Sequence, residues 1–265
     1  MTTAIIGAGV MGETLLSGLL RAGVPKSELL IADRRIERSA EVTKEHGVAN
    51  GTNQEVAAKA DTVVLVVKPQ DMAIVLDEIK DSLRPGTLVV SLAAGITTGF
   101  MEDLLPAKTP VIRVMPNTPA LVDQGMAAIS SGTNSTEDHL VTVETLLRSV
   151  GQVVRVPEKY QDAVTAISGS GPAYIFYVVE AMIEGGVMLG LPRDVANELV
   201  LQTVYGAATM LRETSEHPTV LREQVTSPGG TTVAALRQFD DFKVRAAFLS
   251  AMEAARDRSK ELGMQ

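Results

Sequence analysis

The stretch that most constrains the fold is Thr62–Val67, which reads Thr-Val-Val-Leu-Val-Val and contains only β-branched residues and leucine. An apolar run of this length is typical of a central strand in a parallel sheet that helices cover on both faces. Similar runs alternate with helical patterns at Val10–Arg21 and Ile36–His46. This alternation predicts an α/β domain built on a doubly wound parallel sheet. The other expected strands are Thr3–Ile6, Glu28–Ala32, Thr87–Leu92 and Val111–Val114.

The pattern changes near Asp162, beyond which we predict no further strand. Apolar residues at helical spacing predict helices over Ala173–Leu189, Asp194–Leu211 and Phe242–Leu262. We therefore expect two domains, an α/β domain over residues 1–160 and an all-α domain over residues 161–265.

The second domain has a composition that favours packing against another copy of the chain. Aromatic residues make up only 3% of the 265 residues and tryptophan is absent, so the interior must be built from aliphatic side chains. Roughly 100 helical residues rich in alanine and glycine form a thin domain that buries little surface alone. We expect a dimer at least, with these helices in the interface.

Charge and cysteine content exclude several classes of function. The formal net charge is −8 and no basic block occurs, which argues against nucleic acid as a partner. Cysteine is absent, so disulfides, thiolate catalysis and cysteine metal sites are excluded. Continuous apolar runs are far shorter than the ~20 residues that span a bilayer, and no signal peptide is expected. We expect a soluble cytoplasmic protein without a membrane partner.

A glycine motif, Gly7-Ala8-Gly9-Val10-Met11-Gly12, follows the first expected strand and opens the first expected helix. The first glycine permits a tight turn, the second lets the backbone approach a pyrophosphate, and the third allows close packing of helix on strand. Asp33 lies 21 residues after Gly12, at the end of the next strand. The first domain is therefore predicted to be of the Rossmann type and to bind a nicotinamide dinucleotide.

Asp33 and its neighbours indicate opposite cofactor preferences. An acidic residue at this position normally accepts a hydrogen bond from the ribose 2′-hydroxyl of NADH. Arg34 and Arg35 follow directly, and guanidinium groups suit the 2′-phosphate of NADPH. We expect NADPH to be preferred and NADH to be accepted.

Further cofactor contacts are expected at the carboxyl ends of the later strands. Pro116 and Pro119 bracket Asn117 in a rigid loop that could hold an amide near the nicotinamide. The residues predicted at these strand ends are Val67, Lys68, Pro69, Ala93, Ala94, Gly95 and Asn117.

Two glycine-rich segments in the second half, Ser168–Tyr174 and Ser227–Thr232, each precede an apolar stretch with helical spacing. A helix N-terminus exposes backbone N–H groups and attracts anions, and both segments add hydroxyl side chains. Together with the dinucleotide motif, they predict a nicotinamide enzyme whose substrate carries a carboxylate.

Lys68 is the only lysine inside a motif, and a Lys-Pro pair at a strand end is as easily a cofactor contact as an acid. The three histidines, His46, His139 and His217, lie in polar segments, and no cluster has metal-ligand spacing, so no metal is predicted. Alcohol oxidation would require a histidine or lysine base. A cyclic imine makes fewer demands, because its nitrogen can arrive protonated, and a hydroxyl such as Thr232 or Ser227 is suited to assist that proton.

The chain resembles the pyrroline-5-carboxylate reductases along essentially its full length. The matching segments are Ile6–Gly12, Val67–Pro69, Ala93–Gly95, Asn117–Pro119, Asp162–Thr165, Ser168–Tyr174, Gly190–Pro192 and Ser227–Thr232. The resemblance implies hydride transfer from NAD(P)H to 1-pyrroline-5-carboxylate, which forms L-proline in the final step of proline biosynthesis. It also implies a Rossmann domain followed by a helical dimerisation domain, in dimers that can assemble into decamers.

The same resemblance assigns roles to individual residues. The ring and carboxylate of the substrate would be surrounded by Ser227, Gly229, Gly230, Thr231 and Thr232. The Thr232 hydroxyl would hydrogen-bond to the ring nitrogen, with Ser227 nearby. Asn53, Lys68 and Asn117 would lie along the cofactor. Gln224 falls where some relatives carry a substrate-contacting asparagine, and Asp33, Arg34 and Arg35 depart from the serine-rich loop of some relatives.

Two other functions fit parts of the sequence. A related imine or β-hydroxyacid reductase would place a lysine or aspartate facing the nicotinamide on an inter-domain helix, and residues 173–189 contain neither. A dinucleotide-sensing dimer without chemistry would not need the hydroxyl-rich Ser227–Thr232 turn.

Overall fold

The computed structural model describes residues 1–263, and their contacts divide the chain into two units. The first unit comprises Met1–Ser170 together with the end of the chain from Ala255, and the second comprises Gly171–Ala254. The predicted fold class, a Rossmann-type domain with an all-α second domain, is confirmed.

The first unit contains an eight-stranded sheet in the order β3-β2-β1-β4-β5-β6-β7-β8. Strands β1 to β6 are parallel, whereas β7 runs antiparallel to β6 and parallel to β8. The bounds are β1 Thr3–Ile6, β2 Leu29–Ala32, β3 Ala49–Asn50, β4 Thr62–Leu65, β5 Leu88–Ser91, β6 Val111–Met115, β7 Gly125–Ser131 and β8 Gly151–Arg155.

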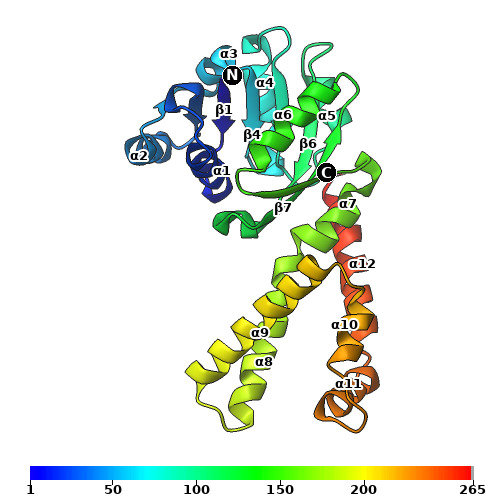
Figure 1. Ribbon diagram of the computed structural model, residues 1–265. Coiled ribbons are helices and arrows are strands. Elements are labelled where there is room, and N and C mark those ends of the chain that lie inside the picture. The colour runs from blue at the N-terminus through cyan, green and yellow to red at the C-terminus, as the bar shows by residue number, and fades with distance from the viewer. Residues whose placement is uncertain (264–265) are drawn as a thin grey trace. The chain divides into compact units, whose positions relative to one another are not determined.

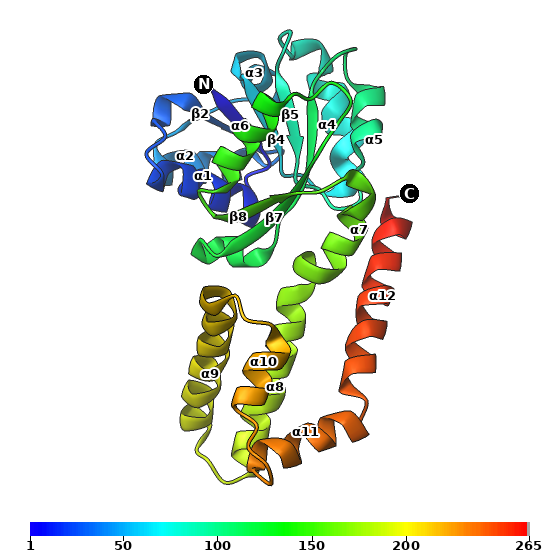
Figure 2. The ribbon, with the colours of Figure 1, turned by 45° about the vertical axis from the view of Figure 1, so that its right-hand side comes forward.

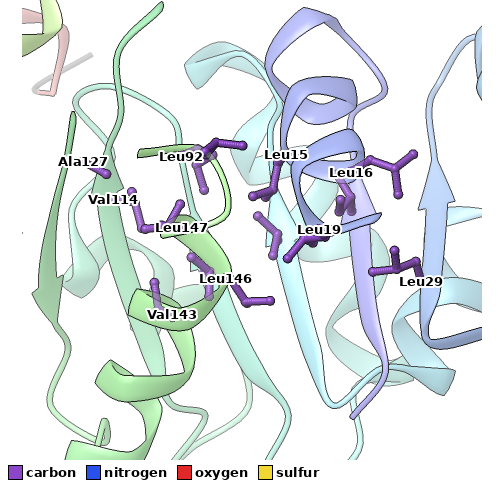
Figure 3. Close-up of a cluster of buried hydrophobic side chains, with 14 of the residues drawn as sticks. Leu15, Leu16, Leu19, Leu29, Leu92, Val114, Ala127, Val143, Leu146 and Leu147 are labelled. Atoms are coloured by element: carbon purple, nitrogen blue, oxygen red, sulfur yellow. The ribbon is translucent and has the colours of Figure 1, made fainter. Parts of the chain in front are cut away.

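Helices cover both faces of this sheet (Figures 1 and 2). A hydrophobic core lies on each face, which explains the continuous apolar run at Thr62–Val67. Val64 faces the core under α1, α2 and α6, while Val63 faces the core under α3, α4 and α5. Figure 3 shows leucines of α1 and α6 meeting over the sheet. The helix bounds are α1 Val10–Arg21, α2 Ile36–His46, α3 Asn53–Lys59, α4 Met72–Ile79, α5 Thr98–Leu104 and α6 Glu137–Leu147.

The second unit is entirely helical and hides few of its side chains. Within Gly171–Ala254, Ala196 and Val200 alone are buried, both on α9 where it packs against α8. Helix α8 carries only two charged residues, Glu180 and Glu184, and is otherwise mostly apolar, a composition typical of helices that are largely covered. The bounds are α8 Gly171–Met188, α9 Arg193–Thr214, α10 Pro218–Gln224, α11 Thr231–Asp241 and α12 Val244–Leu262, whose last turns belong to the first unit.

The helix predicted after the Ser168–Tyr174 segment is present as α8, which begins at Gly171, but the segment is not a separate helix N-terminus. Helix α7, Gln161–Val164, continues through a π-helical turn at Thr165–Gly169 into α8. The Ser170 N–H donates to the Thr165 carbonyl at 2.8 Å, so the helical hydrogen bonding does not restart here. The glycines and Pro172 mark an irregular turn inside a helical run rather than an anion-binding terminus.

Three strands were not predicted, the two-residue β3 and the edge strands β7 and β8. β7, which reads Gly-Met-Ala-Ala-Ile-Ser-Ser, and β8 lack the β-branched runs that marked the central strands.

The helical run Glu158–Met188 is, by length and composition, apolar enough to cross a membrane, although no continuous apolar stretch in it reaches that length. The core helix of a soluble protein passes the same test.

Candidate active site

The Gly7–Gly12 loop has the close approaches that require glycine. Gly7 has a φ of +110°, and a Cβ there would lie 2.4 Å from the Val66 carbonyl oxygen. A Cβ on Gly12 would lie 1.9 Å from the Gly7 oxygen. A Cβ on Gly9, by contrast, would meet nothing within 4 Å, because this residue borders an open cleft. Gly7 and Gly12 therefore shape the loop, and Gly9 leaves room for a ligand.

The cleft beside this loop has a volume of about 1120 Å³ and lies within the first unit. It is bounded by the loop, the end of β2, the start of α3 and the end of β4, at the carboxyl edge of the sheet where dinucleotides bind. The predicted cofactor residues that line it are Gly7, Gly9, Asp33, Arg34, Arg35, Asn53, Val67 and Lys68.

Both carboxylate oxygens of Asp33 accept hydrogen bonds from backbone N–H groups. Oδ2 accepts a hydrogen bond from the Ala8 N–H at 2.7 Å, and Oδ1 accepts one from the Arg35 N–H at 2.8 Å. Its side chain is 12% exposed, while those of Arg34 and Arg35 are 82% and 65% exposed. Asp33 thus braces the glycine loop, and the two guanidinium groups stand at the rim of the cleft.

Asn53 begins α3 at the opposite rim. Its Nδ2 donates to Glu78 Oε2 at 2.7 Å, and the preceding Thr52 forms a capping box with Glu55. The hydrogen bond from the Thr52 N–H lowers the pKa of the Glu55 carboxyl below its ordinary value of 4.5. The rim therefore carries carboxylates as well as Arg34, Arg35 and Lys68, and the cations are concentrated near the glycine loop and β4.

Several predicted cofactor residues lie outside this cleft. Ala8 and Gly12 are buried, and Val10 is an exposed first residue of α1. Met11 and Asn117 line a small apolar cavity of about 10 Å³, room for one water molecule at most. The remaining positions, Pro69, Ala93, Ala94 and Gly95, follow β4 and β5 at the carboxyl edge of the sheet.

The Asn117 amide is engaged at both ends inside the first unit. Its Nδ2 donates to the Ser168 carbonyl at 3.0 Å, and its Oδ1 accepts from the Met126 N–H at 2.8 Å. Pro172 has no N–H with which to bond that carbonyl four residues earlier in the helix, so Asn117 supplies the missing donor. A cofactor contact by Asn117 stays a prediction.

The predicted substrate residues all belong to the second unit, around the start of α11. The Gly230 N–H donates to the Ser227 carbonyl at 3.0 Å, and Gly229 has a φ of +70°. Proline followed by such a glycine is the combination of a type II turn. Gly230 caps α11 without a side-chain hydrogen bond. The Ala234 N–H donates back to Gly230, so the N–H groups of the first turn face outward.

Gln224 ends α10, three residues before this turn, and is exposed. The hydroxyl of Thr231 is on an exposed residue, whereas Thr232 is half-buried. The structure thus gathers Gln224, Ser227, Gly229, Gly230, Thr231 and Thr232 into one turn and its flanks.

Sequence reasoning missed a charged network under the glycine loop. Arg38 of α2 donates through Nε to the Ala8 carbonyl at 2.8 Å and pairs with Glu13 of α1. His46 Nε2 lies 3.3 Å from the other oxygen of Glu13. Glu13, Glu45 and His46 have ligand atoms close enough for a metal, but the Arg38 guanidinium already pairs with the Glu13 carboxylate. No signal in the sequence marked Arg38, because its partners come from α1 and the loop.

The glycine loop, the cleft and the sheet order define a nicotinamide-dependent oxidoreductase with a separate helical unit. Two family descriptions match the chain accordingly: residues 2–95 match the NADP oxidoreductases described as coenzyme F420-dependent, and residues 158–262 match the pyrroline-5-carboxylate reductase dimerisation domain.

Known proteins are similar to this chain along nearly its whole length. A pyrroline-5-carboxylate reductase of Corynebacterium melassecola is 46% identical, with 99% of this chain and 98% of the relative covered, and one of Arabidopsis thaliana is 42% identical, with 97% and 94% covered. The solved pyrroline-5-carboxylate reductase of Coxiella burnetii superposes with a TM-score of 0.93 at 37% identity, with 98% of each chain covered. The Plasmodium falciparum enzyme, solved with NADP bound, gives 0.87 at 30% identity, with 99% and 98% covered.

The chain belongs to the pyrroline-5-carboxylate reductases. It is an oxidoreductase that reduces 1-pyrroline-5-carboxylate to L-proline with a nicotinamide cofactor, the final step of proline biosynthesis. The predicted family, reaction and cofactor class are confirmed, and a dimerisation domain agrees with the expected association of copies.

Proposed function

We propose that this pyrroline-5-carboxylate reductase prefers NADPH, accepts NADH, and binds the substrate carboxylate at the start of α11. The observation that carries the proposal is the pairing in one chain of a dinucleotide cleft with a turn whose hydroxyls and backbone N–H groups face outward. No stronger acid–base group accompanies that turn in the sequence, which suits an imine.

The NADPH preference rests on the use of Asp33. Its two oxygens already accept from the Ala8 and Arg35 N–H groups, so the carboxylate is largely committed to the loop. Arg34 and Arg35 are free to turn toward a 2′-phosphate, since each is paired only across 3.5–3.6 Å with a carboxylate at the rim. The matching NADP family description and the NADP-bound relative support the same preference.

The dinucleotide fits the chain at Gly9. The open space around its Cα admits a phosphate, and Gly9 caps α1, whose first N–H groups and positive dipole end favour an anion. We assign the neighbouring Gly7, Ala8, Val10, Met11 and Gly12 to the same loop. Asn53, Val67, Lys68 and Pro69, with Ala93, Ala94, Gly95 and Asn117, are proposed along the rest of the cofactor.

When bound, the nicotinamide supplies the hydride. The chain's own contribution is to hold the carboxylate at the N–H groups of Thr231 and Thr232 and to keep a proton on the ring nitrogen through the Thr232 hydroxyl. Ser227, Gly229 and Gly230 shape the turn around the ring, with Gln224 at its edge. Holding the imine carbon in line with the cofactor supplies most of the rate enhancement, because orientation removes a large entropic cost.

We also propose that the protein is a cytoplasmic homodimer through its second unit, and that dimers assemble further into decamers. The dimer is supported by the exposed apolar side chains of α8, among them Ile175, Phe176 and Tyr177, which are 51%, 65% and 74% exposed within one copy. Large apolar side chains exposed on several sides of one helix are typical of a surface that is covered in the assembled protein.

The test follows absorbance at 340 nm with pyrroline-5-carboxylate and either NADPH or NADH. We expect both cofactors to be oxidised, with the higher kcat/KM for NADPH, and we expect an R34A/R35A variant to lose that advantage. Thr232→Ala should lower kcat, whereas Thr145→Ala, an exposed hydroxyl on α6 that bonds only its own helix, should not. Tight NADPH binding without oxidation, or full activity in Thr232→Ala, would refute these assignments.

A further inference from the structure

The Ala8 peptide groups in the glycine loop are held from both sides by charged side chains. The Ala8 N–H donates to Asp33 at 2.7 Å, and the Ala8 carbonyl accepts from Arg38 Nε at 2.8 Å. Ala8 itself is fully buried. Two consecutive peptide planes, one on each side of the Ala8 Cα, are therefore fixed by Asp33, which follows β2, and by Arg38 of α2.

The second of these planes determines where the Gly9 N–H points. The Ala8 carbonyl and the Gly9 N–H belong to one planar trans peptide, in which the two groups point in opposite directions. Because Arg38 holds the carbonyl, the Gly9 N–H is turned away from Arg38. Gly9 borders the cleft, and its lack of a side chain leaves it free to rotate when nothing fixes the plane.

Arg38 is in turn fixed by carboxylates. Its guanidinium contacts Glu13 of α1 and lies 3.3 Å from Glu41 one turn further along α2. The side chains of Arg38 and Glu13 are each 24% exposed, so the pair is sheltered from solvent. Three separate acceptors, a carbonyl and two carboxylates, match the fork of a guanidinium and exceed what one ammonium group can span.

We propose that Arg38 is a positioning residue for cofactor binding, which sets the Ala8–Gly9 peptide so that the Gly9 N–H faces the pyrophosphate. The proposal rests on the proposed role of the Gly7–Gly12 loop. Arg38 does not touch the cofactor; it acts through the loop and through its own anchor, Glu13.

The test compares Arg38→Met, Arg38→Lys and Glu13→Gln with Arg155→Met. Arg155 is the matched control, because it also pairs with two carboxylates, Glu137 and Glu144, but contacts no loop of the cleft. For each variant we would measure the NADPH Kd by titration without substrate, both KM values, kcat and Tm. Direct titration keeps this test separate from the reaction, so that a wild-type enzyme inactive on pyrroline-5-carboxylate would overturn the proposed function alone.

Arg38→Met is expected to raise the Kd and the KM for NADPH about tenfold, which corresponds to the loss of one charge-assisted hydrogen bond. The kcat and the KM for the substrate should stay within about twofold of the wild-type values. Arg38→Lys should recover part of the affinity, and Glu13→Gln should weaken it by a smaller factor. An NADPH Kd that is unchanged, or that changes only in step with Tm as in Arg155→Met, would overturn the proposal. If Arg38→Met does not fold, Glu13→Gln and Arg38→Lys decide by the same criterion.

Discussion

Replacing Arg113 with methionine is expected to destabilise the first unit by about 2–3 kcal/mol. Arg113 lies on β6 with its side chain only 5% exposed, 3.4 Å from Glu158 and 4.0 Å from Asp162. The substitution keeps most of the side-chain volume and removes the charge, so the two carboxylates lose their shared cation in a largely buried place.

The magnitude follows from what the carboxylates retain. Breaking a fully buried ion pair costs about 3–5 kcal/mol, because it leaves an uncompensated charge. Here Glu158 still accepts from the N–H and hydroxyl of Thr98 at 2.7 and 2.6 Å, and Asp162 still accepts from the Ser259 hydroxyl at 2.7 Å. Both carboxylates are also 27% exposed, so water screens part of the loss.

The assay is thermal and urea unfolding at one fixed protein concentration, because association shifts the midpoint. A loss of this size lowers Tm by about 4–12 °C at about 2–4 °C per kcal/mol for a domain of this size. Arg148→Met is the control, an exposed arginine whose removal should change stability by less than about 0.5 kcal/mol. If Arg113→Met had the same Tm and urea midpoint as the Arg148→Met control, the buried ion pairs would contribute nothing to stability and the reasoning would be refuted.

Gly9→Ala should leave Tm unchanged, since its Cβ meets nothing within 4 Å, yet raise the KM for NADPH at least about tenfold by obstructing the pyrophosphate. Gly12→Ala should lower both Tm and NADPH affinity, because its Cβ would lie 1.9 Å from a carbonyl oxygen of the same loop; equal effects of the two variants would contradict this distinction. The hydrogen bond from the Thr2 N–H, together with the Arg84 guanidinium, lowers the pKa of the Asp61 carboxyl below its ordinary value of 3.8. The stability that Asp61 contributes is therefore present above pH 3.8 and is lost as the pH falls through the lowered pKa. Urea midpoints of wild type and Asp61→Asn should therefore converge in acid, and a gap that widens there would be the contrary result. Phe176→Asp should reduce the oligomeric mass measured by light scattering, and an unchanged mass would remove this face of α8 from the interface.

The central sheet was predictable because its burial is symmetric. A strand covered on both faces needs apolar residues at every position, and β4 sends Val63 and Val64 to different cores. The prediction extended β4 by two residues, to Val67, although its ladder ends at Leu65. Val66 and Val67 still pack against the two cores, and they also line the cleft.

The edge of the sheet was not predictable by the same signal. β7 consists of small and mixed residues, and its antiparallel pairing with β6 depends on partners thirteen or more residues away. Ala127 and Ile129 of β7 belong to the core under α1 and α6, and the Gln161 amide donates to the Ala128 carbonyl and the Ser130 hydroxyl at 3.3 and 2.8 Å. Such long-range contacts leave no local periodicity.

Long-range contacts also explain why motif spacing located the cofactor loop but did not show which polar atoms around it are already hydrogen-bonded. Gly7, Gly9 and Gly12 stand at a fixed spacing in one short loop, and a short-range pattern of this kind is visible in a sequence. The atoms of Asp33 and Asn117 are committed by distant groups, the Ala8 N–H and the Ser168 carbonyl, that sequence spacing does not bring together. A motif therefore identifies where the backbone can admit a ligand, while tertiary hydrogen bonds decide which side chains remain free to touch it. By that rule Arg34 and Arg35, exposed and loosely paired, are better candidates for the 2′-phosphate than Asp33 is for the ribose hydroxyl.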